Sequence, residues 1–353
     1  MKHRFNYNWT LEKAVFTKDK GTVFDTFSCG GGSGMGYLLA GFDVIGNLEI
    51  DEDKNRAYVT NHHPLFSYQQ DIREFRLRDD LPSELYNLDI LGGSPPCKSF
   101  SVTGIRDATW GKVVTKYGIT QVWDDLFFEL IALAKKLQPK VVIAENVKGI
   151  IIGDAIKYVR KIYEQFDEAG FYCQHFLLNA ALMGVPQRRE RVIFICLRKD
   201  LAEPFLYQKD MFTIAPKIDM EFNEPPIFYG EFADDDGKEI KGKSLCELWE
   251  NRQYGDVLMA DAAMRMFNKR KAFNEMYLYK DKISPTQTAH MDSLIPFHKC
   301  KYPSLHETCC IASYPQDYDF CGNSYHELCG RSVPPVMMAN IATRVYEQWL
   351  SKI

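Results

Sequence analysis

A cysteine directly behind two prolines is the first residue of this sequence that could do covalent chemistry. It is Cys97, in the stretch GGSPPCKSFS at 92–101, which follows the apolar run LDIL. Prolines fix the backbone φ angle, so Pro95 and Pro96 should hold the thiol in one pose at a strand end. A thiol there is a candidate nucleophile if its surroundings lower its pKa. Taken alone, a buried structural cysteine is the simpler interpretation.

Three further side chains could handle protons or anions. Glu145 follows directly on the apolar stretch 139–144, and a carboxyl group at a buried strand end should have a raised pKa, which suits proton donation. Arg189 and Arg191 are two apart at the start of another apolar run, so they should point to the same side. Paired guanidinium groups fit carboxylates, phosphates or a base oxygen. The plainer alternatives are a helix-capping acid and a basic surface edge.

A glycine-rich turn indicates where a cofactor could bind. The stretch FDTFSCGGGSGMG at 24–36 runs from a strand through a turn into a helix, and its glycines would let the backbone approach a ligand. Glu49 ends the second predicted strand and could accept both hydroxyls of a ribose. Asp71 could meet an adenine amine. Together these residues indicate a nucleoside cofactor, although an ordinary tight turn would explain the glycines alone.

The elements that would position these groups alternate along the first 200 residues. Strands are expected at 22–27, 43–49, 88–93, 139–146 and 191–197, and helices at 53–63, 123–137 and 155–166. This alternation predicts an α/β fold with a doubly wound, mostly parallel sheet. The last of these helices is expected to bury Ile156, Val159, Tyr163 and Phe166. Ligands of such sheets bind at the carboxyl ends of the strands, where the candidate residues fall.

The domain organisation follows from where the alternation stops. It ends near residue 200 and gives way to an irregular mixture until about 320, and a helix is then expected at 334–350. We therefore predict one domain of residues 1–199 and 324–353, which carries the candidate residues. A smaller, irregular domain is predicted at 200–323.

Composition excludes several classes of protein. Apolar residues make up 46% and charged residues 25% of the chain, which is ordinary for a soluble enzyme. No run reaches the roughly 18 apolar residues of a membrane span, and no signal peptide is recognisable, so a cytoplasmic location is predicted. The ten cysteines form no C-x-x-C pair, so no metal site is expected. With a net charge of −4, any nucleic-acid-binding face has to be local.

In order and spacing, these motifs resemble the DNA cytosine-5 methyltransferase family. The resemblance covers nearly the whole chain and rests on FSCGGGSGMG, SPPCKSFS, ENV, QRRER and GRSVPP. It implies a Rossmann-like enzyme that takes a one-carbon group from S-adenosylmethionine and acts as a monomer on double-stranded DNA, as in restriction-modification systems. Residues 1–199 and 324–353 would be the catalytic and cofactor-binding domain. Residues 200–323 would be the target-recognition domain, and SPTQTAH at 284–290 resembles the stretch that closes it.

The resemblance also implies roles for single residues. The Cys97 thiolate would add to carbon 6 of a flipped-out cytosine, which makes carbon 5 a nucleophile. Glu145 would hold the exocyclic amine and nitrogen 3, Arg191 the base oxygen, and Arg189 a loop or the Glu145 side. The implied cofactor contacts are Phe27, Gly31, Glu49, Ile50, Asp71, Ile72, Pro96, Leu126 and Ser332. The implied DNA contacts are Lys98, Ser101, Arg106 and Gln187, the first three on a loop at 98–122 that could close over the base.

Two departures from the family pattern stand near the cofactor. The closing motif has Gly330-Arg331 where the family has Gly-Asn, close to the transferred group, and Cys29 stands where the family has a glycine. Arg331 could turn outward or pair with a nearby acid. Alternatively, it could pair with an anion on the donor, as in carboxy-S-adenosylmethionine, and the enzyme would then transfer a carboxymethyl group. Such a charge-assisted pair in a dry site contributes about 1.5–3 kcal/mol.

Three rival functions remain open at this stage. A tRNA-directed member of the same fold would be expected to carry a CFT element in the small domain, and the sequence has none there. A nicotinamide-dependent oxidoreductase would explain the glycine turn but not Pro-Pro-Cys, Glu-Asn-Val or the arginine pair. A relative that only binds DNA would not need Cys97, Glu145, Arg189 and Arg191 together.

Overall fold

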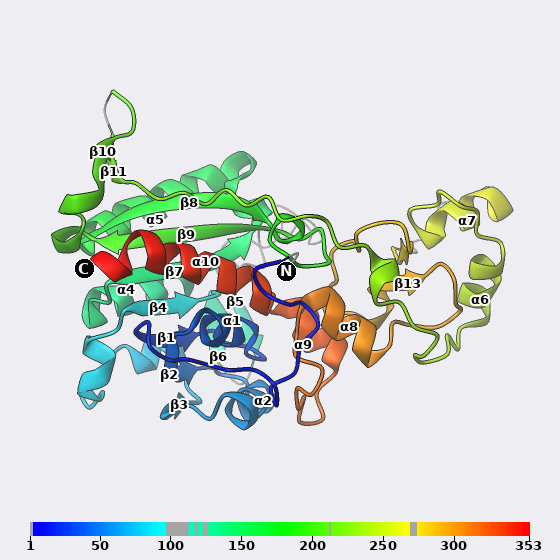
Figure 1. The fold of residues 1–353 in the computed structure, drawn as a ribbon, viewed down its shortest axis with the longest axis horizontal. Coiled ribbons are helices and arrows are strands. Elements are labelled where there is room, and N and C mark those ends of the chain that lie inside the picture. The colour runs from blue at the N-terminus through cyan, green and yellow to red at the C-terminus, as the bar shows by residue number, and fades with distance from the viewer. Residues whose placement is uncertain (1–2, 97–112, 117–118, 123–125, 212, 269–273) are drawn as a thin grey trace. The chain divides into compact units, whose positions relative to one another are not determined.

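The chain forms two compact units, shown in Figure 1. A computed structural model describes residues 3–96, 113–116, 119–122, 126–211, 213–268 and 274–353. The sheet unit comprises Phe16–Leu178, Glu190–Glu221 and Met338–Ile353. The small unit comprises Met1–Val15, Asn179–Arg189 and Phe222–Met337.

A seven-stranded sheet of order β3-β2-β1-β4-β7-β9-β8 forms the centre of the sheet unit. Its strands are β1 (Thr22–Thr26), β2 (Asp43–Leu48), β3 (Phe66–Tyr68), β4 (Ile90–Gly93), β7 (Val141–Val147), β8 (Phe171–Asn179) and β9 (Glu190–Arg198). The first five pair in parallel, and β9 runs antiparallel to β7. The predicted α/β fold with a mostly parallel sheet is therefore confirmed.

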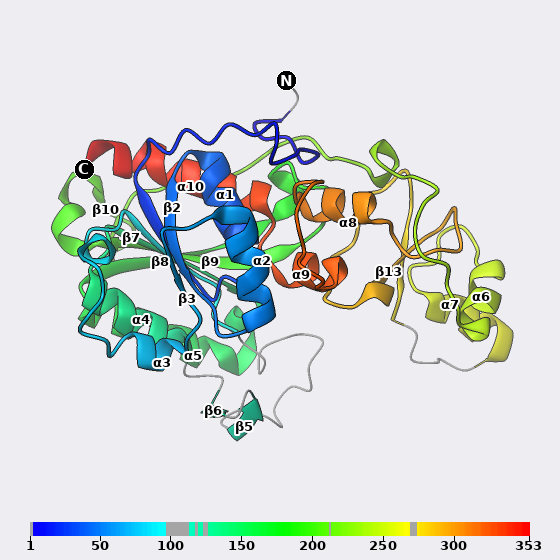
Figure 2. The same cartoon turned by 90° about the horizontal axis from the view of Figure 1, so that it is seen from below.

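Helices cover both faces of this sheet. Figure 2 shows α3 (Ile72–Phe75), α4 (Leu126–Leu137) and α5 (Ile156–Glu168) on one face and α1 (Gly32–Ala40) on the other. A further helix, α2 (Glu52–His62), begins just after β2. The apolar residues of α4 and α5 recur at helical spacing, so each helix buries one side in the core.

The expected buried face of α5 is partly wrong. Val159 and Phe166 are buried as expected, but the other buried side chains are Tyr158 and Ile162. Ile156 is 40% exposed, because it is the first residue of the helix and lies at the edge of the core contact.

Most of the C-terminal helix, α10 (Pro335–Gln348), packs in the sheet unit, which resumes at Met338. The Tyr346 ring packs edge-on against Phe42 with a centroid distance of 6.0 Å. The indole of Trp349, which is fully buried, donates a hydrogen bond to the Lys217 carbonyl at 2.8 Å. These contacts hold the end of the chain against elements of the first 220 residues.

Two pairs of short antiparallel strands lie outside the sheet in the described part of the chain. One consists of β10 (Leu206–Gln208) and β11 (Ile214–Pro216). The other consists of β5 (Val113–Lys116) and β6 (Ile119–Val122), within the loop at 98–122 that was predicted to cover the base.

The small unit is built from short elements around two apolar clusters. These helices and strands are α6 (Lys243–Glu250), α7 (Met259–Phe267), β12 (Met276–Leu278), β13 (Leu294–Pro296), α8 (Leu305–Ala312) and α9 (Tyr325–Arg331). A buried ionic cluster holds the start of α8, where Lys299 lies 2.6 Å from Glu307 and 2.9 Å from Asp234. The irregular composition of 200–323 thus corresponds to short elements held by side chains rather than by a large sheet.

The packing units differ in their bounds from the predicted domains. Met1–Val15 and Asn179–Arg189 pack in the small unit, whereas the predicted division assigned them to residues 1–199. The segment from 200 to 221 packs in the sheet unit. The functional division into 1–199 with 324–353 and 200–323 stays a prediction, because packing units need not coincide with functional domains.

Candidate active site

Three of the predicted motifs emerge at one edge of the sheet. Strand β4 lies between β1 and β7, with Thr26 paired to Gly93 and Gly93 paired to Ala144. The carboxyl ends of these parallel strands are therefore neighbours. The glycine-rich turn and the prolines before Cys97 leave the sheet at this edge, and Glu145 lies in β7 just beyond its last pair with β4.

The two glycines before the proline turn are required by close packing. A Cβ atom on Gly93 would lie 2.7 Å from Thr26 Oγ1 and 2.9 Å from Leu130 Cδ2. A Cβ atom on Gly92 would lie 2.9 Å from the Tyr37 hydroxyl. Only glycine fits here, so β4 is confined on both faces before it reaches the turn.

The proline turn is held by a side chain of the next strand. Asn146 is 2% exposed, and its Nδ2 donates to the Pro95 carbonyl at 3.4 Å. Pro95 is buried and Pro96 is half-buried. Cys97, Lys98, Ser101 and Arg106 lie outside the described residues, so their roles stay predictions.

Glu145 and Arg191 form an ion pair at this edge. Arg191 Nε lies 2.8 Å from Glu145 Oε1, and the two side chains are 15% and 13% exposed. The register explains the pair, because Arg191 is opposite Val147 on the antiparallel strand, two residues beyond Glu145. Residues two apart on a strand share a face. The pair fixes the orientation of the carboxylate and leaves Oε2 with no partner among the described residues.

Arg189 has different partners from Arg191. It is 2% exposed, and its Nη1 donates to the carbonyls of Gln287 and Gly330, both at 3.1 Å. Of the two roles implied for Arg189, these contacts favour holding a loop. Gln187 is also buried, at 1% exposure, and bonds to Ile311 and Gln287. Its position does not support the implied direct contact with DNA.

The glycine-rich turn adopts a left-handed backbone at three residues. Phe27, Cys29 and Gly31 have φ angles of 51°, 46° and 83°. Left-handed angles favour glycine, so Cys29 keeps the backbone conformation that the family's glycine would adopt. The turn is tied to β2, because Cys29 N donates to Glu49 Oε2 at 2.8 Å and Asp51 N to Oε1 at 3.0 Å. Burial raises the pKa of Glu49.

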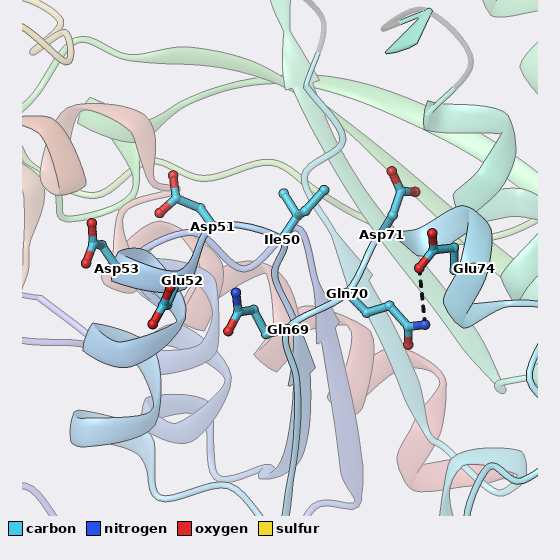
Figure 3. Close-up of a pocket in the computed structure, with 8 residues that line it drawn as sticks. All are labelled: Ile50, Asp51, Glu52, Asp53, Gln69, Gln70, Asp71 and Glu74. Atoms are coloured by element: carbon cyan, nitrogen blue, oxygen red, sulfur yellow. Dashed lines mark hydrogen bonds between the residues drawn. The ribbon is translucent and has the colours of Figure 1, made fainter. Parts of the chain in front are cut away.

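A pocket of about 540 Å³ lies beyond the ends of β2 and β3. Two of the implied cofactor contacts line it, Ile50 and Asp71, and Figure 3 shows Ile50 between Asp51 and Asp71. The remaining lining residues are Asp51, Glu52, Asp53, Gln69, Gln70 and Glu74. The volume falls in the usual range for small-molecule sites. Its many carboxylates suit a ligand that presents hydroxyl and amine donors, as an adenosine group does.

The other implied cofactor contacts lie outside this lining. Ile72 and Leu126 are 3% and 5% exposed and belong to the core cluster, against which Phe27 also packs. Ser332 is 5% exposed, and its Oγ is buried with no hydrogen-bond partner among the described residues. An unpaired buried hydroxyl is costly, so this atom fits a position that a ligand completes.

Arg331 pairs with an acid of its own helix. Its Nε lies 2.9 Å from Glu327 Oε1, one turn earlier on α9, and both side chains are well exposed. The sequence had left open that Arg331 turns outward or pairs with a nearby acid, and the structure shows the pairing. Because Glu327 already accepts the guanidinium, an anionic donor would have to compete with it.

Asp25 is a buried acid that sequence reasoning missed. It is 1% exposed in β1 and accepts a hydrogen bond from Ser33 Oγ at 2.7 Å. Burial raises the pKa of Asp25 to about 7, and nearby Glu49 adds to this. The signal in the sequence is an acid inside the apolar run 23–27. The bond to Ser33 fixes the start of α1 and with it the end of the glycine turn.

Neither a metal cluster nor a membrane helix is found in the part of the chain that the structure describes. No group of three or more His, Cys, Asp or Glu side chains there could hold a metal ion. None of the helices in the described ranges has the length and apolarity that a membrane crossing requires.

Comparison with known proteins gives the family. The model of the C-5 cytosine-specific DNA methylase family matches residues 21–347. Type II methyltransferase M.FnuDI of Fusobacterium nucleatum is 38% identical over 51% of this chain. The matched part spans about half of that relative, 47% of its length. Type II methyltransferase M.Bsp6I of a Bacillus species is 26% identical over 90% of this chain and 98% of its own length.

Solved structures show the same fold. A prophage-encoded protein of E. coli, described as a DNA modification methyltransferase, superposes with a TM-score of 0.65 at 18% identity, over 93% of this chain and 99% of its own. The family match covers nearly the whole chain. The strand order and the motifs at the sheet edge agree with it. The chain belongs to the C-5 cytosine-specific DNA methylase family.

Proposed function

We propose that this protein transfers a methyl group from S-adenosylmethionine to carbon 5 of cytosine in a specific sequence of double-stranded DNA. Family membership supports the reaction type. The observation that carries the proposal is the Glu145–Arg191 pair at 2.8 Å. It stands at the sheet edge where the turns leading to Cys97 and to the cofactor region also emerge.

The proposed chemistry assigns one task to each group. The Cys97 thiolate adds to carbon 6 of a flipped-out cytosine, and electron density moves to carbon 5. In the form protonated at Oε2, Glu145 donates this proton toward nitrogen 3, while Oε1, held by Arg191, accepts from the exocyclic amine and Arg191 donates to the base oxygen. After carbon 5 has taken the methyl group, it loses its proton to solvent water, and that electron pair expels the Cys97 thiolate and restores the aromatic ring.

S-adenosylmethionine, when bound, supplies an electrophilic methyl group on a sulfonium. Ile50 would pack on its adenine and Asp71 would accept from the adenine amine, since both line the acidic pocket. Glu49 would accept from the ribose hydroxyls. Ser332 would use the Oγ that has no partner among the described residues.

Transfer of a carboxymethyl group from carboxy-S-adenosylmethionine is the alternative for the donor. Arg331 motivates it, but the Glu327 carboxylate pairs with that guanidinium at 2.9 Å. The pocket lining also includes five carboxylates, on Asp51, Glu52, Asp53, Asp71 and Glu74, which disfavour an additional negative charge. Both observations support methyl transfer.

One assay tests the reaction and the donor together. The purified protein is incubated with duplex DNA and either donor, and nucleosides are analysed by mass spectrometry. We expect 5-methylcytosine with S-adenosylmethionine, and no product with Cys97→Ser. Formation of 5-carboxymethylcytosine in preference to 5-methylcytosine would reverse the donor assignment. Labelling of tRNA but not of DNA would overturn the substrate assignment.

We further propose that the protein works as a monomer within a restriction-modification system. The relatives M.FnuDI and M.Bsp6I, both type II methyltransferases, support the biological setting. Bisulfite sequencing of DNA from expressing cells should show one short modified sequence. Modification at unrelated cytosines would contradict a type II role.

A further inference from the structure

Gln187 and Arg189 are buried polar residues in a motif that was expected to face the substrate. They are 1% and 2% exposed, whereas Arg188 between them is exposed. A buried guanidinium is tolerated only where hydrogen bonds replace its hydration. The partners of these two side chains therefore indicate what the motif does.

The backbone of 187–189 lies alongside the stretch 284–288. Gln187 forms a parallel bridge with Ser284, and Arg188 N donates to the Ser284 carbonyl at 2.9 Å. In return, Thr286 Oγ1 donates to the Arg188 carbonyl at 2.6 Å. The SPTQTAH stretch is thus joined to the QRRER motif over several residues.

The Gln187 side chain extends this connection to α8. Its Oε1 accepts from Gln287 N at 3.1 Å, and its Nε2 donates to the Ile311 carbonyl at 3.0 Å. One amide therefore connects the SPTQTAH stretch to the helix behind it.

Arg189 joins the same stretch to the closing motif. One guanidinium nitrogen donates to the carbonyls of both Gln287 and Gly330. The two segments touch closely, because a Cβ atom on Gly330 would lie 2.0 Å from the Thr288 carbonyl oxygen. Ser332, an implied cofactor contact, follows two residues later.

The side chains of the stretch itself do not provide equivalent bonds. Ser284 Oγ and both amide atoms of Gln287 are buried and have no hydrogen-bond partner among the described residues. Among the described residues, the side chains outside the stretch that bond to its backbone at 284–288 are Gln187, Arg189 and Ser293, whose Oγ accepts from Thr288 N at 3.4 Å.

We infer that Gln187 and Arg189 are positioning residues that couple DNA binding to cofactor binding. They set the SPTQTAH stretch, which is expected to close the target-recognition domain, against the Gly330–Ser332 turn, which is expected to contact the cofactor. The inference rests on the proposed function, because it takes the ligands of these two segments from it. Neither side chain touches the base in this assignment.

The test measures binding of two ligands alone and together. Wild type, Arg189→Lys and Gln187→Met are each titrated with duplex DNA that carries the recognition site, in the presence and absence of S-adenosylhomocysteine. Each protein is also titrated with S-adenosylhomocysteine, in the presence and absence of that DNA. In the wild type, each ligand should raise the affinity for the other by the same factor. Both variants should lose that factor and bind each ligand roughly tenfold more weakly, as the loss of one or two buried hydrogen bonds implies.

A matched control is Arg188→Lys, which makes the same change on the exposed neighbour and should retain the wild-type coupling factor. Melting temperatures identify a variant that does not fold, in which case the other variant decides. Retained coupling in Arg189→Lys with a reduced kcat would overturn the inference in favour of a catalytic role. A wild type that binds both ligands without coupling would also overturn it. Because binding needs no turnover, failure of the proposed reaction would be seen separately, as absent methylation.

Discussion

The Glu145 carboxylate has two oxygens, and Arg191 takes one of them. The guanidinium lies 2.8 Å from Oε1, and both side chains are largely withdrawn from water. Because little water screens them, the two opposite charges attract each other more strongly than they would on the surface. The carboxyl group is therefore oriented before a base arrives, with Oε2 left to face nitrogen 3.

We predict that Glu145→Gln lowers kcat by about 10²-fold or more while DNA still binds, because the amide cannot supply the proton. Single-turnover methyl transfer at saturating DNA and cofactor measures this. Glu190→Gln is the control, since Glu190 is an exposed acid that pairs with Lys148 at 2.9 Å. A rise in KM for DNA with an unchanged kcat would assign Glu145 to binding alone.

Asp25 gives a second prediction, on pH dependence. Its pKa is about 7 in the folded protein and near 3.8 in an unfolded chain. As pH rises, the unfolded state loses this proton first, so the contribution of Asp25 to stability falls between about pH 4 and pH 7. Asp25→Asn keeps an acceptor for Ser33 and should become more stable relative to wild type across that interval.

Chemical denaturation at several pH values between 4 and 8 measures the difference. Asp79→Asn, at an exposed acid, is measured in parallel as the matched variant. Parallel stability curves for wild type and Asp25→Asn would show that Asp25 is ionised in the folded state throughout.

At the scale of elements, the sheet edge depends on how tightly β4 packs. Gly93 lies against Thr26 and Leu130, at distances where no Cβ atom fits. Gly93→Ala should destabilise the fold by about 1–3 kcal/mol through overpacking. Urea denaturation compares it with Gly242→Ala, where the nearest atom would be 3.5 Å away and little change is expected. Equal stability of the two variants would show that β4 can shift.

Most strands of the main sheet could be predicted from their apolar runs, whereas the short elements of the small unit could not. Strands β1, β2, β4, β7 and β9 were expected close to their observed bounds because apolar runs end at turn residues. Strand β8 was missed, because its buried and half-buried positions do not alternate. The buried face of α5 depends on which residues meet the core, and a single apolar pattern does not settle that.

The site was predictable in its residue types but not in its pairings. Glu145 and Asn146 were recognisable as polar residues after a buried strand. The Glu145–Arg191 contact arises from an antiparallel register between strands about 45 residues apart in sequence, which local spacing does not encode. The burial of Arg189 depends on segments near 287 and 330. A target DNA sequence is not readable either, because no code links groove contacts to this segment.

At the scale of the whole molecule, residues of the first fifteen bond to residues 304 to 306 positions away. Trp9 Nε1 donates to the Ser313 carbonyl at 2.9 Å, and Leu11 N and Glu12 N donate to the Asp317 carboxylate at 2.7 and 3.0 Å. Residues 1–15, here called the N-terminal arm, thus donate hydrogen bonds to the end of α8 and to Asp317 just after it, both in the small unit. The N-terminal arm is therefore part of that unit's structure rather than an extension of the sheet unit.

Removal of residues 1–15 should loosen the small unit more than the sheet. We expect faster amide hydrogen exchange at 305–320, where the partners of the arm lie, and unchanged exchange in β1, β4 and β7. Hydrogen exchange followed by mass spectrometry resolves these peptides. Uniform acceleration across both units would instead show that the arm supports the entire fold.

The boundary between the units falls between Arg189 and Glu190, and this has a consequence for exchanging recognition specificity between relatives. A chimaera that replaces only 200–323 would keep Gln187 and Arg189 from one parent and their partners near 284–288 from the other. An exchange that preserves these bonds moves two separate segments, 179–189 and 200–323, and leaves β9 in place. Arg191, two residues after Arg189, should stay with the parent that supplies Glu145.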